Sequence, residues 1–184
     1  DVDFNAGNRR ANVFVAARDI AKSMGGRSLF RNLEIELGPG TRLGIVGNNG
    51  SGKTTLLRIL AGQLAPDAGD VRHAPQLRVA LFDQNRAQLD PSQTLRRALS
   101  PGGDTVNFRG QSQHVVGWAQ RFLFRPDQLD NLVGALSGGE QARVMIARLM
   151  QQPADLLLLD EPTNDLDIAS LDILEAGLID FPGA

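Results

Sequence analysis

The feature that most limits the possible folds is a glycine-rich stretch at residues 47–54, Gly-Asn-Asn-Gly-Ser-Gly-Lys-Thr. It matches the pattern GxxxxGK[ST], in which glycines let the backbone curl so that successive N–H groups point at one anion. The apolar run at 43–46 before it predicts a buried strand. Leu56, Leu60 and Leu64 after it predict one face of a helix. A strand, a phosphate-binding loop and a helix in this order are typical of an α/β domain.

The residue types of this stretch suit the phosphates of a nucleotide. A helix that begins near Lys53 directs its positive end at them, and Lys53 supplies a mobile charge for the β- and γ-phosphates. Lys53 is conspicuous because the chain has 19 basic residues, of which Lys22 is the only other lysine. The alternative is a structural glycine-rich turn. The expected nucleotide-binding residues here are Gly47, Asn48, Asn49, Gly50, Ser51, Gly52, Lys53, Thr54 and Thr55.

Two carboxylates follow an aliphatic run at residues 156–159. This run predicts a buried strand, and ligands bind at the carboxyl ends of strands in parallel sheets. We expect Asp160 to hold Mg²⁺ through water, together with the Thr54 hydroxyl, and Glu161 to act as the general base that polarises the attacking water. The alternative is a helix cap or a surface acidic pair.

The segment Leu-Ser-Gly-Gly-Glu at 136–140 resembles a second anion-seeking helix start. Ser137 is a plausible helix cap, and Gly138 and Gly139 allow backbone N–H groups to come close to an anion. A plain capped turn is the alternative for this segment taken alone.

Apolar periodicity places further elements along the chain. The segments 13–20, 33–37 and 69–82 resemble strands, and 94–99, 114–124, 140–150 and 168–178 resemble helices. Residues 1–12 are polar and predict a linker. Strands alternating with helices predict α/β layers around a mainly parallel sheet.

Composition excludes several classes of protein. The chain of 184 residues has no cysteine, which excludes disulfides, thiol catalysis and cysteine-ligated metal centres. The net charge of −2 gives no overall basic field for nucleic acid. No uninterrupted aliphatic run is long enough to cross a membrane.

Together these motifs resemble the ATP-binding cassette (ABC) family. Residues 47–54 resemble its Walker A motif, 156–161 its Walker B motif, 136–141 its signature and 161–167 its D-loop. Gln84 resembles the Q-loop glutamine, which adds it to Thr54 and Asp160 as an expected metal ligand. The form Glu-Pro-Thr-Asn-Asp-Leu-Asp is similar to the F subfamily, and residues 82–90 and 106–124 resemble the second cassette of its Uup-like branch.

This resemblance implies a P-loop NTPase of the ABC type at residues 13–184, with a mainly parallel core sheet, an antiparallel β subdomain and a helical signature subdomain at about 86–152. It implies a soluble, cytoplasmic ATPase that uses ATP and Mg²⁺. A second cassette, on the same polypeptide or in a dimer, would be its partner in a nucleotide sandwich. Ser137, Gly138 and Gly139 would then bind the partner's ATP. The target would be the ribosome in translation; the alternatives are the motor subunit of a membrane transporter and a DNA-associated clamp gated by ATP.

The sequence departs from the family pattern in two places. Cassettes stack adenine on an aromatic residue, but Met24 occupies that place here, with Phe30 as a possible substitute, and the chain has no tyrosine. This predicts a weak base contact with loose base selectivity. The chain also ends at residues 181–184, before the expected switch histidine and its strand. We therefore expect a fragment whose hydrolytic activity belongs to the intact parent and is weak or absent in isolation.

The remaining conspicuous residues have ordinary structural explanations. Trp118, Phe122 and Phe124 suit core packing better than base stacking. His73 is expected on a strand surface and His114 at the start of a helix. The arginines suit a solvated surface better than an RNA contact, which the following positions would otherwise provide: Arg9, Arg10, Arg96, Arg97, Arg109, Arg121 and Arg125.

Overall fold

The computed structural model describes residues 13–82, 89–108, 110–164, 166–179 and 181–184. The chain divides into two compact units, each of which is described by itself. The first, here called the sheet unit, comprises Asp1–Phe82, Ala154–Asp160 and Phe181–Ala184. The second, here called the helical unit, comprises Asp83–Pro153 and Glu161–Asp180.

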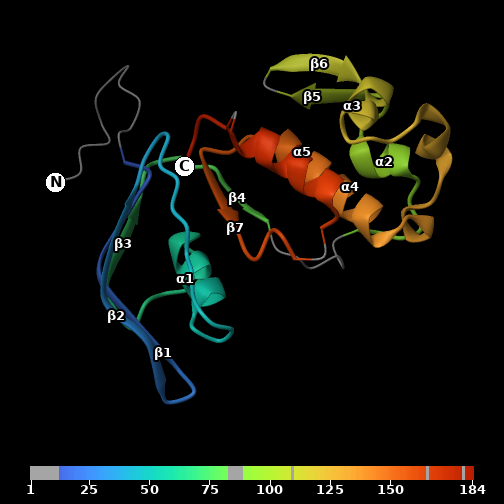
Figure 1. Ribbon diagram of the computed structural model, residues 1–184. Helices are drawn as coiled ribbons and strands as arrows, with labels where there is room; N and C mark the ends of the chain where they lie inside the picture. Colours follow the sequence, from blue (N-terminus) through green and yellow to red (C-terminus); the bar gives the residue numbers. More distant parts are fainter. Residues whose placement is uncertain (1–12, 83–88, 109, 165, 180) are drawn as a thin grey trace. The chain divides into compact units, whose positions relative to one another are not determined.

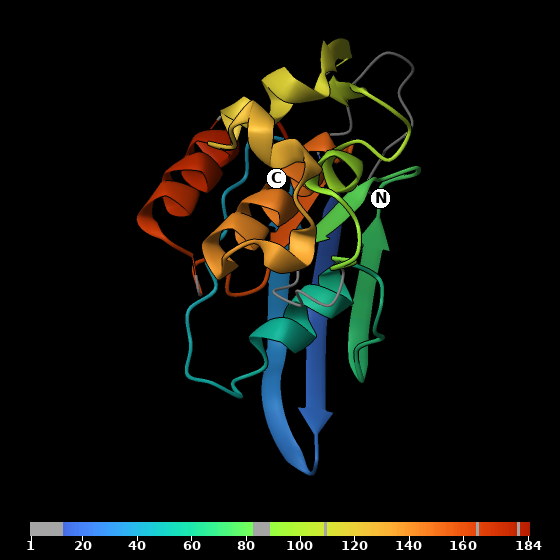
Figure 2. The same cartoon turned by 90° about the vertical axis from the view of Figure 1, so that its right-hand side faces the viewer.

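An antiparallel sheet of three strands forms one layer of the sheet unit. Its strands are β1 (Val15–Met24), β2 (Arg27–Leu37) and β3 (Ala68–His73), in the order β2-β1-β3 (Figure 2). The predicted strands at 13–20 and 33–37 are confirmed as parts of β1 and β2. The alternation that predicted them appears as a buried row on one face, where Val15 lies opposite Leu37 and Ala17 opposite Ile35.

A parallel pair of strands forms the second layer of this unit. Strand β4 (Val79–Phe82) pairs with β7 (Leu156–Leu159), and Val79 lies opposite Leu156. An ion pair sets this register at its first residue. Arg78 Nη2 lies 2.6 Å from Asp155 Oδ1, Arg78 Nε donates to Oδ2 at 3.0 Å, and the Asp155 N–H donates to the Arg78 carbonyl at 2.8 Å.

Helix α1 (Lys53–Leu60) lies between these layers and closes the core (Figure 1). Leu56, Leu57, Ile59 and Leu60 are buried against residues of both sheets. The predicted helix is confirmed, but Leu64 lies beyond its end. The chain leaves the helix through Gly62, whose φ of 74° is the left-handed conformation that favours glycine after a helix.

The prediction of a buried strand at Leu43–Val46 is wrong. These residues have no strand structure, and the Leu43 and Val46 side chains are 52% and 99% exposed. An apolar run becomes a strand only where a neighbour takes its hydrogen bonds. The edge of β7 instead pairs with the segment at 183–184, through bonds from Leu157 N–H to the Ala184 carbonyl and from Ala184 N–H to the Asp155 carbonyl.

In its described residues the helical unit has α-helices that match the predicted ones with shifted ends. They are α2 (Leu95–Leu99), α3 (Val115–Arg121), α4 (Gly138–Gln151) and α5 (Ile168–Ile179). Figure 1 shows α4 and α5 side by side. The predicted apolar face of α4 is buried, and it consists of Ala142, Met145, Ile146 and Leu149. Single 3₁₀ turns, Pro126–Asp130 and Val133–Ala135, lead into α4.

An antiparallel hairpin that the sequence did not reveal precedes α3. It consists of β5 (Thr105–Phe108) and β6 (Gln111–His114). The rings of Phe108 and Phe122 both pack against Trp118, with 4.9 Å between ring centroids in each pair. Trp118 is 1% exposed. Phe122 and Phe124 are equally buried. The interpretation of these aromatic residues as core is therefore correct.

In the part of the chain that the structure describes, every helix is too short or too polar to span a lipid bilayer.

Candidate nucleotide-binding site

The predicted phosphate loop is an exposed turn directly before α1. Gly50 and Gly52 have φ of 76° and 101°, the left-handed region that side chains rarely adopt. The Ser51 N–H closes the turn by donating to the Asn48 carbonyl at 3.1 Å. A side chain at position 47 would overlap the Ser51 hydroxyl. Backbone geometry thus favours glycine at two positions of the motif, Gly50 and Gly52, while the Ser51 side chain leaves little room at Gly47.

Lys53 folds back over this loop. Its Nζ donates to the Gly47 carbonyl at 2.9 Å and lies 3.3 Å from that of Asn48. The helix that it begins has no side-chain cap at Gly52 and no acidic residue in its first turn. An uncapped helix start beside an ammonium group is suited to an anion, because the first backbone N–H groups and the helix dipole both favour negative charge.

Met24 lies beside the start of α1. The Thr55 hydroxyl donates to Met24 Sδ at 3.7 Å, and the Met24 side chain is 56% exposed. The end of β1 is held by Lys22, whose Nζ lies 2.6 Å from Asp67 Oδ1. This contact lowers the pKa of Asp67 below its ordinary value. Phe30 packs instead against the hydrophobic core of the sheet unit.

The expected metal ligands are only partly described. Asp160 directly follows β7, and its N–H donates to the Phe82 carbonyl at 3.0 Å, which extends the β4–β7 pairing to this residue. Thr54 is exposed in the first turn of α1. Gln84 lies outside the described residues. Among the residues described, no group of three or more His, Cys, Asp or Glu side chains gathers at one point.

Glu161 begins a tight turn in the helical unit. Its φ of 47° is left-handed, and the Asn164 N–H donates to its carbonyl at 3.1 Å. The side chains of the two residues are also hydrogen-bonded, since Asn164 Nδ2 donates to Glu161 Oε2 at 2.6 Å. Strained backbone of this kind is concentrated at functional sites in proteins.

The segment at 136–140 forms a reciprocal cap at the start of α4. The Ser137 hydroxyl accepts from the Glu140 N–H at 3.3 Å and donates to Glu140 Oε2 at 2.9 Å, while the Ser137 N–H donates to the same oxygen at 2.8 Å. Gln128 Nε2 donates to Glu140 Oε1 at 3.0 Å. The backbone N–H of Ser137 is the main cause that lowers the pKa of Glu140. The predicted role of Ser137 as a helix cap is confirmed.

The second signature glycine packs against the D-loop segment. A side chain at Gly139 would overlap Asp167 Oδ2. Asp167 also accepts from Arg143 Nη1 at 3.1 Å and from the Ser170 N–H at 2.7 Å. The Arg143 side chain is only 13% exposed. Sequence reasoning missed Arg143 and Gln128, because their partners lie 24 and 12 residues away and no local pattern marks either contact.

The predicted structural role of His114 is confirmed, since it caps α3 by accepting from the Val116 N–H at 3.3 Å. His73 lies on a strand, as expected, at the end of β3. It is half-buried, and its Nε2 donates to the Leu60 carbonyl at 2.8 Å, which joins β3 to α1.

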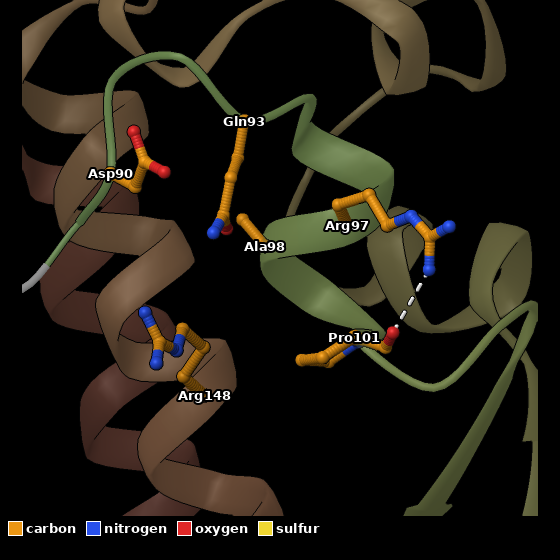
Figure 3. A pocket seen from close by; sticks show the side chains of 6 residues that line it. All are labelled: Asp90, Gln93, Arg97, Ala98, Pro101 and Arg148. Atoms are coloured by element: carbon orange, nitrogen blue, oxygen red, sulfur yellow. Dashed lines mark hydrogen bonds between the residues drawn. The ribbon is translucent and has the colours of Figure 1, made fainter.

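A hollow of about 420 Å³ in the helical unit is separate from these motifs. Figure 3 shows Arg97 turned from it toward the Pro101 carbonyl, to which it donates at 3.0 Å. Other arginines considered for RNA contact also have partners within the unit: Arg96 pairs with Asp104 and Arg125 with Asp127. Arg9, Arg10 and Arg109 lie outside the described residues. The hollow is lined by Asp90, Gln93, Arg97, Ala98, Pro101 and Arg148.

Comparison with known proteins gives the same assignment as the motifs. Residues 30–164 match the family model described as ABC transporter. The chain is 40% identical to the ATP-binding protein Uup of Escherichia coli K12 over 176 residues, which is 96% of this chain and 28% of that protein. Identity to Uup of Caulobacter vibrioides is 44% over 170 residues, or 92% of this chain and 28% of that protein.

A relative with a different name is also similar to this chain. The energy-dependent translational throttle protein EttA of Haemophilus influenzae is 39% identical over 180 residues, 96% of this chain and 32% of that protein. The chain thus spans about a third or less of the length of these relatives. They confirm the predicted resemblance to the Uup-like branch of the F subfamily, and the matched family implies nucleotide binding. Because the family model matches most of its length and the family's motifs are present, this chain belongs to the ABC transporter family.

Proposed function

We propose that this chain is an ATP-hydrolysing cassette of the F subfamily that works with a second cassette. The observation that supports this most strongly is the loop at 47–54, with its left-handed glycines, its uncapped helix start and Lys53 folded over it. The nine residues from Gly47 to Thr55 would hold the phosphates, and Met24 would contact the base.

The residues have separate tasks in the proposed reaction. Backbone N–H groups of the loop and the Lys53 ammonium group bind the triphosphate and stabilise the charge that develops as the γ-phosphate leaves. Thr54, Gln84 and Asp160 would hold Mg²⁺, which when bound neutralises phosphate charge. Glu161 accepts a proton from the attacking water. Ser137, Gly138 and Gly139 would contact the γ-phosphate bound to the facing cassette.

The hydrolytic role of Glu161 is tested by Glu161→Gln in the natural protein. We expect ATP to bind with wild-type affinity while turnover falls by about 10²–10⁴-fold, the usual contribution of a positioned base. Phosphate release and equilibrium binding of ATP measure the two quantities. Unchanged turnover, or a parallel loss of binding, would remove Glu161 from this role.

We propose the ribosome in translation as the target. The support is the likeness to EttA, which is named as a translational throttle protein. The alternatives are a membrane permease and branched DNA. Glu161→Gln protein held with ATP should sediment with ribosomes and not with membrane vesicles or a four-way DNA junction. ATP-dependent retention by vesicles or by the junction alone would favour the corresponding alternative.

A further inference from the structure

A four-residue turn determines the direction of the Glu161 side chain. Pro162 occupies its second position, where its fixed φ suits a β-turn, and the Asn164 N–H closes the turn on the Glu161 carbonyl at 3.1 Å. Glu161 itself is left-handed, at φ 47°. The backbone of this residue is therefore held in a sparsely populated conformation by the turn that follows it.

The Asn164 side chain adds a second contact to the same residue. Its Nδ2 donates to Glu161 Oε2 at 2.6 Å, a short bond to a charged acceptor. Both residues are exposed. A glutamate side chain has three rotatable bonds, and an amide donor anchored on the same turn reduces the directions that the carboxylate adopts.

We propose that Asn164 is a positioning residue for Glu161: its side-chain amide holds the carboxylate in the orientation that accepts the proton of the attacking water. The proposal rests on the proposed role of Glu161 as the general base. A residue that acts only on the orientation of the base changes the chemical step and leaves nucleotide binding intact.

Two substitutions in the natural protein remove the donor in different ways. Asn164→Ala deletes the amide, and Asn164→Asp keeps the shape but replaces the donor with a second carboxylate. We expect kcat to fall about 10-fold or more for Asn164→Ala, and further for Asn164→Asp, with KM and equilibrium ATP affinity within about 2-fold of wild type. Thr163→Ala, an exposed change in the same turn, is the matched control and should retain wild-type kcat.

A double-mutant cycle with Glu161→Gln tests whether Asn164 acts through Glu161. If it does, adding Asn164→Ala to Glu161→Gln leaves the residual turnover unchanged. The same fold-loss in both backgrounds, a wild-type kcat in Asn164→Ala, or a loss confined to KM would each overturn the proposal. A wild-type protein that binds no ATP or does not hydrolyse it would instead overturn the proposed function, so the two failures are distinguishable.

Discussion

A side chain at Gly139 has to displace the Asp167 carboxylate. A β-carbon there would overlap Asp167 Oδ2, and Asp167 is fixed by Arg143 and the Ser170 N–H. We expect Gly139→Ala to cost about 1–3 kcal/mol of unfolding free energy, because it displaces Asp167 and leaves the nearly buried Arg143 without its carboxylate. Urea unfolding measures the change.

The matched control for that substitution is Gly117→Ala in α3. A β-carbon at Gly117 has no atom within 4 Å, so alanine there should stabilise the helix by about 0.5–1 kcal/mol. Equal effects of the two alanines would contradict the steric account of Gly139.

The prediction of loose base selectivity depends on Met24. Because its sulfur lies beside Thr55 at the start of α1, an aromatic ring at this position would lie next to the phosphate loop. We expect Met24→Tyr to tighten ATP binding by about 3–10-fold, the value of one aromatic stacking contact. Titrations with ATP and GTP measure this effect; wild-type protein should bind both with similar affinity. A strong wild-type preference for ATP would show that the base is recognised elsewhere.

The β4–β7 pair depends on one ion pair at its start. Arg78 lowers the pKa of Asp155 below its ordinary value of 3.8 by a side-chain hydrogen bond to the carboxylate. Such a group stabilises the fold above about pH 4, and this contribution is lost as the pH falls further, through the lowered pKa of the folded state. Acid should therefore weaken the strand pair that presents Asp160.

Asp155→Asn tests this contact. We expect the substitution to cost about 1–2 kcal/mol at pH 7, because it removes two charge-assisted hydrogen bonds from Arg78. The gap from wild type should narrow progressively as the pH falls below about 4 and through the lowered pKa of Asp155 in the folded state. Urea unfolding at several pH values measures it, and a gap that does not change with pH would contradict the assignment.

Elements were predictable where one short stretch of sequence determined them. A buried face was predicted correctly from the periodic leucines of α1 and from the alternation at Leu33, Ile35 and Leu37. Leu43–Val46 failed because a strand in a parallel sheet depends on a neighbour remote in sequence. The β5–β6 hairpin was missed because its second arm, Gln111–His114, is polar throughout and shows no apolar alternation.

The candidate site was predictable only in part, for the same reason. Its motifs are contiguous, so the loop at 47–54 and the cap at Ser137 were evident from residue type and spacing. Contacts such as Gln128 with Glu140 and Arg143 with Asp167 join segments that the fold brings together. Asn164 is three residues from Glu161, yet nothing in its identity predicts that its amide meets the carboxylate.

A cassette that needs a facing cassette should show concentration-dependent activity. If Ser137–Gly139 serve a partner's nucleotide, the isolated 184-residue chain should hydrolyse ATP slowly, with a specific activity that rises with protein concentration as pairs form. Phosphate release across a 100-fold range of concentration, with sedimentation to follow association, measures this. A high specific activity that is independent of concentration would contradict the sandwich.

The central claim is that the loop at 47–54, with its Lys53, binds a nucleoside triphosphate. The most direct test is calorimetric titration of the protein with Mg–ATP, comparing Lys53→Ala with Arg58→Ala, which removes one positive charge from the other end of the same helix. We predict that Lys53→Ala weakens binding by at least about 10-fold, consistent with loss of a charged phosphate contact, while Arg58→Ala binds as wild type. Wild-type affinity in Lys53→Ala, or equal losses in both variants, would contradict the account.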